Sequence, residues 1–186
     1  MKVALCHLEL SNGPEQKNIE LLEKAVRIAA EKGANWVITP ETAVQGYYFY
    51  KLEPETKVDK QPSSKLSFLL SLVKDYGLFL FLGCGEYDSE LNCNFNSCIV
   101  FEPSGEICGR HRKIISHGIG AEAWARTADV LKPIDCLNIK VGVLVCADAW
   151  YSEHAKKMQK KGAQIIIDIA AVSYTHLRAH ETLRHL

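Results

Sequence analysis

Residues 141–167 read VGVLVCADAWYSEHAKKMQKKGAQIII, in which two apolar runs flank a polar segment. The first run is rich in valine and belongs to an expected strand at 138–148, and the second belongs to an expected strand at 163–171. Few polar residues interrupt either run, which is typical of strands whose sheet is covered on both faces. The charged segment between them, 152–162, predicts a helix that ends at a glycine. This stretch therefore predicts a strand–helix–strand unit and favours an α/β architecture.

The rest of the chain continues this alternation of strands and helices. Segment 41–62 shows no sustained period and is expected to be a long loop, while 94–113 predicts a β-hairpin around the turn EPSGE. A chain of 186 residues has room for one domain with a substantial core. The other expected elements are strands at 3–10, 35–40 and 78–85 and helices at 13–33 and 63–77.

The composition limits the classes of partner. Lys plus Arg and Asp plus Glu each number 22, so no net charge favours nucleic acid or an anionic membrane. No segment approaches the roughly 18 apolar residues that a membrane span needs. His7 and Glu9 interrupt the opening run that a secretory signal would require. The seven cysteines lack the regular spacing of a disulfide framework, so we expect a cytoplasmic protein with reduced thiols.

The last residues of the chain differ in character from the rest. Three of the seven histidines fall within 176–186, and nothing there continues the alternation of strands and helices. Such a tail, rich in histidine and arginine, could bind a metal, but it more closely resembles the translated adapter scars that end some gene sequences. We expect residues 1–172 to form the domain and residues 173–186 to be a non-native tail.

Four side chains that could carry chemistry lie at strand ends or in adjoining loops, where α/β sheets place their sites. Taken singly, each has a simpler explanation. Glu41 could be the N-terminal acid of a helix, Lys113 part of a solvated basic turn, and Glu122 a surface acid. Cys146 follows a strand, where a cysteine is most often a small core residue.

Together the four side chains favour a nucleophilic mechanism. A thiol is mostly protonated at pH 7 and needs a base or a positive neighbour to become a good nucleophile. Glu41 could take the proton of Cys146 and pass it to a leaving amine. Lys113 could stabilise the thiolate and the oxyanion of a tetrahedral intermediate, helped by backbone N–H groups after the cysteine. Glu122 could orient Lys113 or the substrate amine.

Three stretches in this order resemble the nitrilase, or carbon–nitrogen hydrolase, superfamily. They are GANWVITPETAVQGY at 33–47, NFNSCIVFEPSGEICGRHRK at 94–113, and the stretch at 141–167. The resemblance covers residues 1 to about 172. It implies a catalytic triad of Glu41, Lys113 and Cys146, with Glu122 in the position of the family's second glutamate. It also implies an αββα sandwich, no cofactor, and assembly into homodimers or higher homo-oligomers.

The sequence departs from the family pattern in two ways. Ala147 and Asp148 stand where nitrile-hydrolysing members carry Trp-Glu, which favours an amide or N-carbamoyl substrate over a nitrile. Family domains also continue with further strands and helices, so we expect an incomplete sandwich. Tyr47, together with Tyr48, is expected at the mouth of the pocket, and Ala147 is expected to bind the substrate directly after the nucleophile.

Other candidate sites are weaker. The spacing of Cys84, Cys93 and Cys98 does not match a zinc site, because no second pair completes a ligand set. No metal is therefore expected. The four lysines of 152–162 are expected to form a solvated helix face rather than a nucleic-acid contact. Glu86 is expected to border the site in a structural or secondary role.

Three functions remain open on the sequence alone. The first is an amidase acting on a small-molecule amide through a cysteine thioester. The second is a catalytically inactive, truncated fragment or binding module, because missing strands would leave sheet edges and apolar faces open. The third is the glutaminase part of a larger ammonia-channelling enzyme, which would need a partner domain.

Overall fold

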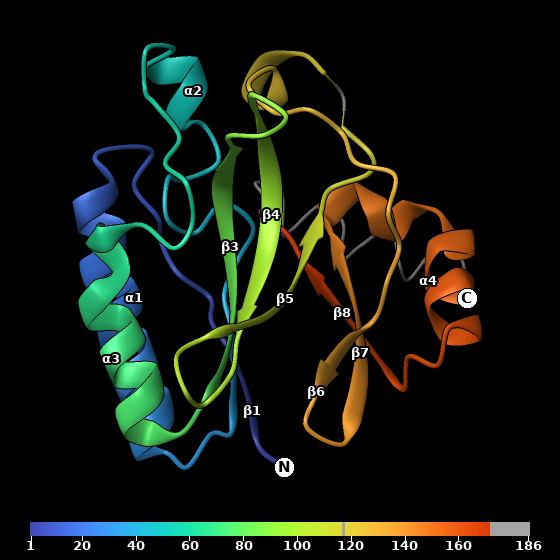
Figure 1. The fold of residues 1–186 in the computed structure, drawn as a ribbon. Coiled ribbons are helices and arrows are strands. Elements are labelled where there is room, and N and C mark those ends of the chain that lie inside the picture. Colours follow the sequence, from blue (N-terminus) through green and yellow to red (C-terminus); the bar gives the residue numbers. More distant parts are fainter. Residues whose placement is uncertain (117, 172–186) are drawn as a thin grey trace, which may run out of the picture.

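The computed structural model describes residues 1–116 and 118–171, so the expected tail at 173–186 lies outside the described residues. These residues form two sheets with helices on both outer sides (Figure 1). The strands of the first sheet, in spatial order, are β1 (Val3–Leu5), β2 (Trp36–Ile38), β3 (Phe79–Asp88), β4 (Cys93–Phe101) and β5 (Ile107–Arg112). Those of the second are β6 (Ile134–Cys136), β7 (Ile139–Val145) and β8 (Ile165–Ile169).

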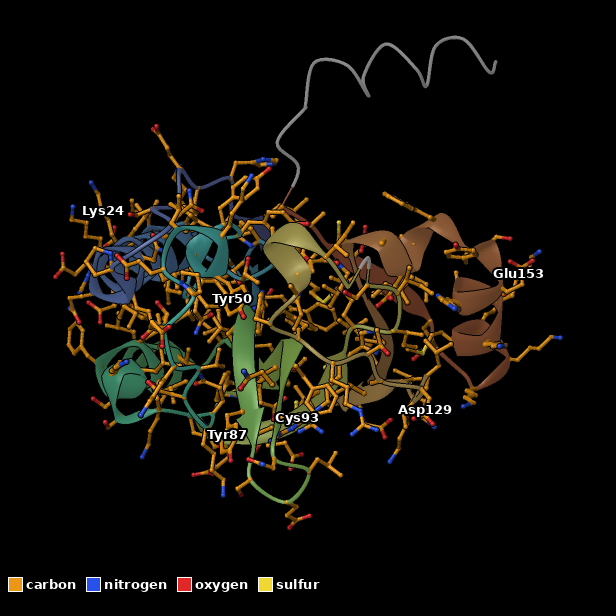
Figure 2. The ribbon with its side chains drawn as sticks, turned by 90° about the horizontal axis from the view of Figure 1, so that it is seen from above. Lys24, Tyr50, Tyr87, Cys93, Asp129 and Glu153 are labelled. Atoms are coloured by element: carbon orange, nitrogen blue, oxygen red, sulfur yellow. The ribbon has the colours of Figure 1, made fainter. Side chains whose placement is uncertain are left out.

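The helices complete four layers in the order helix, sheet, sheet, helix. Helices α1 (Glu15–Glu31) and α3 (Ser67–Tyr76) lie side by side on the outer face of the first sheet (Figure 1). Helix α4 (Ser152–Lys160) covers the outer face of the second. Lys24 on α1 and Glu153 on α4 consequently lie at opposite flanks of the molecule (Figure 2). This arrangement confirms the predicted αββα sandwich.

The pairing within the sheets combines parallel and antiparallel neighbours. β1, β2 and β3 are parallel, and so are β7 and β8, which α4 connects as the strand–helix–strand unit predicted from the sequence. β4 and β5 form the predicted hairpin and run antiparallel to each other. Parallel neighbours need a crossover connection between them, whereas antiparallel neighbours need only a short turn. The order of helices and strands along the chain therefore explains which pairs in the two sheets are parallel and which are antiparallel.

Alternate residues of β3 point to opposite faces of the first sheet. Phe79 and Phe81 belong to the core between the two sheets, whereas Leu80 and Leu82 belong to the core beneath α1 and α3. Because both faces of this strand are buried, its sequence is an almost uninterrupted apolar run. The neighbouring strands share the alternation, so a residue's position along a strand tells which core it enters.

Three observed elements differ from the expected ones. β1 ends at Leu5 rather than at residue 10, because the chain leaves the ladder soon after Cys6 donates its N–H to Ile38 O. The expected loop at 41–62 contains a short helix, α2 (Phe49–Leu52). The three-residue strand β6 was not expected. None of the helices in the described part of the chain is long and apolar enough to cross a membrane.

The sandwich is open along one side. Val3 and Leu5 pair in register with Trp36 and Ile38, whose side chains are buried between the sheets. The side chains of Val3 and Leu5 face the same way but are 40% and 66% exposed, because three strands of the second sheet cannot cover five of the first. β8, at the edge of the second sheet, has no strand on its outer side among the described residues.

Candidate active site

Glu41 and Lys113 meet at one end of the space between the two sheets. Glu41 follows β2 by three residues and Lys113 directly follows β5. The Lys113 Nζ lies 2.7 Å from Glu41 Oε1 and also donates a hydrogen bond to Glu122 Oε1. Each of the three side chains is at most 3% exposed. The structure therefore brings together three of the four residues singled out from the sequence as one buried ionic cluster.

Glycine at two positions lets backbone segments pass close to the Glu41 loop. A Cβ atom on Gly83 of β3 would overlap Pro40 O and lie 2.9 Å from the Cα of Glu41. Gly46 has a positive φ of 81°, and a Cβ there would overlap the carbonyl oxygen of Ser11. The loop that carries Glu41 is thus held by backbone contacts on both sides, which only glycine permits.

The fourth residue, Cys146, occupies a sharp turn where β7 ends. Its φ is 53°, a left-handed conformation that is uncommon for residues other than glycine, and it begins the 3-10 helix Cys146–Trp150. The thiol is partly exposed and lies close enough to the Glu41 carboxylate to feel its charge. Burial and the negative charge of Glu41 raise the pKa of Cys146 to about 12, although Lys113 opposes them. The thiol is therefore protonated at neutral pH and stands beside a carboxylate.

Lys113 stays positively charged in this cluster. Burial lowers its pKa, but the negative charge of Glu41 and the hydrogen bonds to Glu122 and Glu41 outweigh burial and raise the pKa above the usual value. Glu122 itself is held by the Ser116 hydroxyl, 3.1 Å from its Oε2, and by the Tyr47 hydroxyl, 3.4 Å from its Oε1. A permanent cation beside a protonated thiol can stabilise negative charge that forms during an attack by sulfur.

Asp148 ties the end of β5 to the turn at Cys146. Its fully buried carboxylate accepts four hydrogen bonds. They come from the backbone N–H groups of Ile114 at 3.0 Å, Ile115 at 2.7 Å and Val145 at 3.1 Å, and from the His111 Nε2 at 2.9 Å. Desolvation would raise the pKa of Asp148, but the bonds from His111 and Ile115 outweigh it and lower the pKa. Asp148 thus shapes the turn at Cys146, and it also fixes Lys113 relative to Cys146.

Asn96 is a further neighbour of Glu41 that sequence reasoning missed. Its Nδ2 donates to Glu41 Oε1 at 2.7 Å, while the backbone N–H of Ala171 donates to Glu41 Oε2 at 3.1 Å. Asn96 shares its face of β4 with Cys98, which lies in the core between the sheets. The alternation of the stretch NFNS could have placed Asn96 on that face, but nothing local indicates which residue it meets there.

A cleft of about 720 Å³ lies next to the cluster. Its lining includes Tyr47, Tyr48 and Asp168 near the end of β8, but not the four residues Glu41, Lys113, Glu122 and Cys146. Partial burial and the nearby carboxylates raise the pKa of Asp168 to about 6, although the Cys146 backbone N–H bonded to it opposes the shift. Ala147 is only 1% exposed, so its side chain does not reach the cleft.

Glu86 lies on the opposite face of the first sheet from the cluster. Its position in β3 has the same parity as Leu82, which faces α1 and α3. The carboxylate pairs with Arg110 and Arg112 and accepts a bond from the Ser97 hydroxyl at 2.8 Å. Glu86 thus links β4 and β5 to β3 and holds β5, which leads to Lys113, in place.

Residues 2–185 match the family model for carbon–nitrogen hydrolases. The chain is 31% identical to citrullinase of Francisella tularensis, over 100% of this chain and 66% of that protein. It is 30% identical to omega-amidase NIT2 of Xenopus tropicalis, over 89% and 62%. The chain therefore spans less than two thirds of the length of these relatives.

A solved structure shows the same fold. Nit3 of Saccharomyces cerevisiae, a member of branch 10 of the nitrilase superfamily, superposes with a TM-score of 0.84 at 24% identity. The superposition covers 98% of this chain and 69% of Nit3, in keeping with the open side of the sandwich. The match to the family model and the shared fold lead to one conclusion: the chain belongs to the carbon–nitrogen hydrolase family of the nitrilase superfamily.

Proposed function

We propose that this domain hydrolyses non-peptide carbon–nitrogen bonds of small amide or N-carbamoyl substrates through a thioester on Cys146. The observation that carries the proposal is the contact of the Cys146 thiol with Glu41, beside the Lys113 ammonium. A protonated thiol beside a carboxylate can be deprotonated as it attacks, and a buried cation can stabilise the resulting oxyanion.

The first half of the reaction acylates the cysteine. Glu41 takes the thiol proton while sulfur attacks the carbonyl carbon, and the carbonyl oxygen becomes an oxyanion. Lys113, whose pKa is raised, faces that oxyanion as a cation, together with the backbone N–H of Ala147. Glu41 then gives its proton to the nitrogen, the carbon–nitrogen bond breaks, and ammonia or an amine leaves.

The second half of the reaction regenerates the thiol. Water attacks the thioester carbon while Glu41 takes its proton. The carbon–sulfur bond breaks, the proton returns to Cys146, and the carboxylic acid leaves. Glu122 contacts Lys113, so its role is to orient Lys113 and to keep its charge in place. The cleft beside Tyr47 and Tyr48 admits the substrate.

Named relatives support the choice of amide and N-carbamoyl substrates. Citrullinase, omega-amidase NIT2 and the N-carbamoylputrescine amidase of Solanum lycopersicum all match this chain. A nitrilase of Pyrococcus abyssi also matches, at 31% identity. The sequence after the cysteine, Ala147-Asp148, supports an amide over a nitrile as the substrate. In a variant of the Nesterenkonia sp. AN1 amidase, acrylamide adds to the active site cysteine, which agrees with a nucleophilic thiol at this position of the fold.

The proposal is tested by replacing the thiol and its base. Ammonia release from primary amides and N-carbamoyl amino acids should fall at least a thousandfold in Cys146→Ser and Glu41→Gln, while the melting curve keeps its shape. Cys93→Ser is the matched control, because that thiol lies at the far end of the β3–β4 hairpin (Figure 2). Intact-mass detection of an acyl group on Cys146 identifies the thioester. Undiminished turnover in Cys146→Ser would overturn the proposal.

A second candidate function is a catalytically inactive binding module of the same fold. The exposed inner face of β1 and the unpaired edge of β8 favour it, because such surfaces are covered in a stable sandwich. Size-exclusion chromatography and thermal melting of the 186-residue chain separate the two. A monodisperse, cooperatively melting chain that releases ammonia excludes the second candidate, whereas a folded chain without thioester formation supports it.

A further inference from the structure

One buried polar atom beside Glu41 lacks a partner. Asn96 is 2% exposed, and its Nδ2 is bonded to Glu41 Oε1. Across residues 1–116 and 118–171, the Asn96 Oδ1 is the buried side-chain nitrogen or oxygen atom with no hydrogen-bond partner. Buried acceptors in folded proteins are almost always satisfied, so an unsatisfied one in a reactive cluster calls for a partner.

The orientation of the Asn96 amide is fixed by its surroundings. Glu41 Oε1 accepts hydrogen bonds, one of them from Lys113 Nζ, and a carboxylate cannot donate. The amide nitrogen must therefore face Glu41, which leaves the amide oxygen as a free acceptor on the same side-chain group. The backbone is equally constrained, since the N–H of Lys113 donates to the Asn96 carbonyl oxygen at 2.7 Å.

The position of this acceptor matches one atom of the proposed reaction. Glu41 hands its proton to the nitrogen of the scissile bond, so that nitrogen must approach the Glu41 carboxylate. Its remaining N–H groups then need an acceptor close to Glu41 and away from Lys113, which can only donate. The Asn96 Oδ1 is a buried acceptor without a partner, and it belongs to the same amide whose nitrogen donates to Glu41.

We infer that the Asn96 Oδ1 accepts a hydrogen bond from the nitrogen of the scissile bond, and so selects carbonyl compounds that carry an N–H over esters. This inference rests on the proposed function and names its substrate class: primary carboxamides and carbamoyl compounds. The bond strengthens as the nitrogen gains its proton and positive charge. The leaving oxygen of an ester has no hydrogen to donate, so Asn96 gains no partner from it.

The test compares two alkylating probes that differ at this group alone, chloroacetamide and methyl chloroacetate. Both form a carbon–sulfur bond to Cys146 with loss of chloride, whether or not the chain hydrolyses amides. The rate constants for Cys146 are measured by peptide mass spectrometry and divided by those for glutathione. In Asn96→Leu, the ratio of the amide to the ester rate should fall about threefold to tenfold, the range expected for one neutral hydrogen bond.

Two further variants keep the test decisive. Asn96→Asp retains an oxygen acceptor and should retain more of the ratio than Asn96→Leu. Asn94→Leu changes the same face of β4 two residues earlier, and it should leave the ratio unchanged. Equal loss for both probes in Asn96→Leu would overturn the inference, because it would reduce Asn96 to a support for Glu41. If the ratio depends on Asn96 but no amide releases ammonia, the proposed hydrolysis is refuted. The inference that Asn96 accepts a hydrogen bond from the amide nitrogen then still stands.

Discussion

Replacement of Asp148 by asparagine is predicted to destabilise the domain and misplace its reactive groups. The two carboxylate oxygens accept two hydrogen bonds each. In Asp148→Asn one oxygen can still accept from Ile114 and Ile115. The amide NH₂ then faces the N–H of Val145, which is left without an acceptor, while His111 can change tautomer and accept.

The expected magnitude follows from these bonds. One buried N–H without a partner costs about 1–3 kcal/mol, and the loss of charge at two remaining bonds costs about 1 kcal/mol each. The free energy of unfolding should therefore fall by about 3–5 kcal/mol. For a domain of this size, such a loss corresponds to a fall of about 6–20 °C in Tm.

Two assays check this prediction. Thermal melting gives the Tm, and alkylation of Cys146 by chloroacetamide reports whether the turn still presents the thiol to Glu41. Asp129→Asn is the matched control, because Asp129 is exposed and its replacement should change stability by less than about 0.5 kcal/mol. A Tm within about 1–2 °C of that of the parent chain would refute the prediction, because a shift this small is no larger than the shift expected for the control.

The same substitution has a pH signature. The folded-state pKa of Asp148 is lowered, so its contribution to stability is complete above the ordinary carboxyl pKa of about 4 and is lost as the pH falls through the folded value. The difference in stability between the parent chain and Asp148→Asn should therefore be constant from about pH 5 to 8 and shrink below about pH 4. Chemical denaturation across that range measures it.

Three further predictions concern the same cluster. Gly83→Ala should displace the loop of Glu41 and slow thiol alkylation at least tenfold, since the added Cβ meets backbone; an unchanged rate would contradict the packing. Glu41→Gln should lower the pKa of Cys146 from about 12, because a negative neighbour is removed, and so shift the alkylation–pH curve to lower pH. Tyr47→Phe removes one long hydrogen bond to Glu122 and should lower the hydrolysis rate by less than about tenfold.

The sequence predicted most of the layered fold because its strands are buried on both faces. Continuous apolar runs such as Phe79–Leu82 indicate strands whatever their partners. β6 escaped prediction because Ile134–Cys136 is too short to establish a period, and β1 was overextended because residues 6–10 keep an apolar alternation after leaving the ladder. Both errors concern whether a strand forms or where it ends, which depends on pairing with a neighbouring strand and not on the apolar pattern of the strand itself.

The candidate site divides in the same way. Glu41, Lys113 and Cys146 were identified because each stands in a recognisable stretch, and the structure places them together; their catalytic roles stay predictions. Asn96 and Asp148 gain their roles only from contacts across strands or between the two sheets, at sequence separations of 55 and 34 residues in the bonds to Glu41 and Ile114. Local periodicity predicts which face of a strand a residue occupies, but not which residue of another strand or sheet it contacts there.

The backbone contacts at Gly83 and Gly46 limit how the substrate range of the pocket can be changed by mutagenesis. Where two backbone segments are in direct contact, as at these glycines, side-chain substitutions can neither enlarge the space between the segments nor move them apart. We expect the substrate range of the proposed amidase to be adjustable at Tyr47 and Tyr48, which line the cleft, and not at Gly83 and Gly46. Mutagenesis that aims at new amide substrates should vary Tyr47 and Tyr48 and leave the two glycines unchanged.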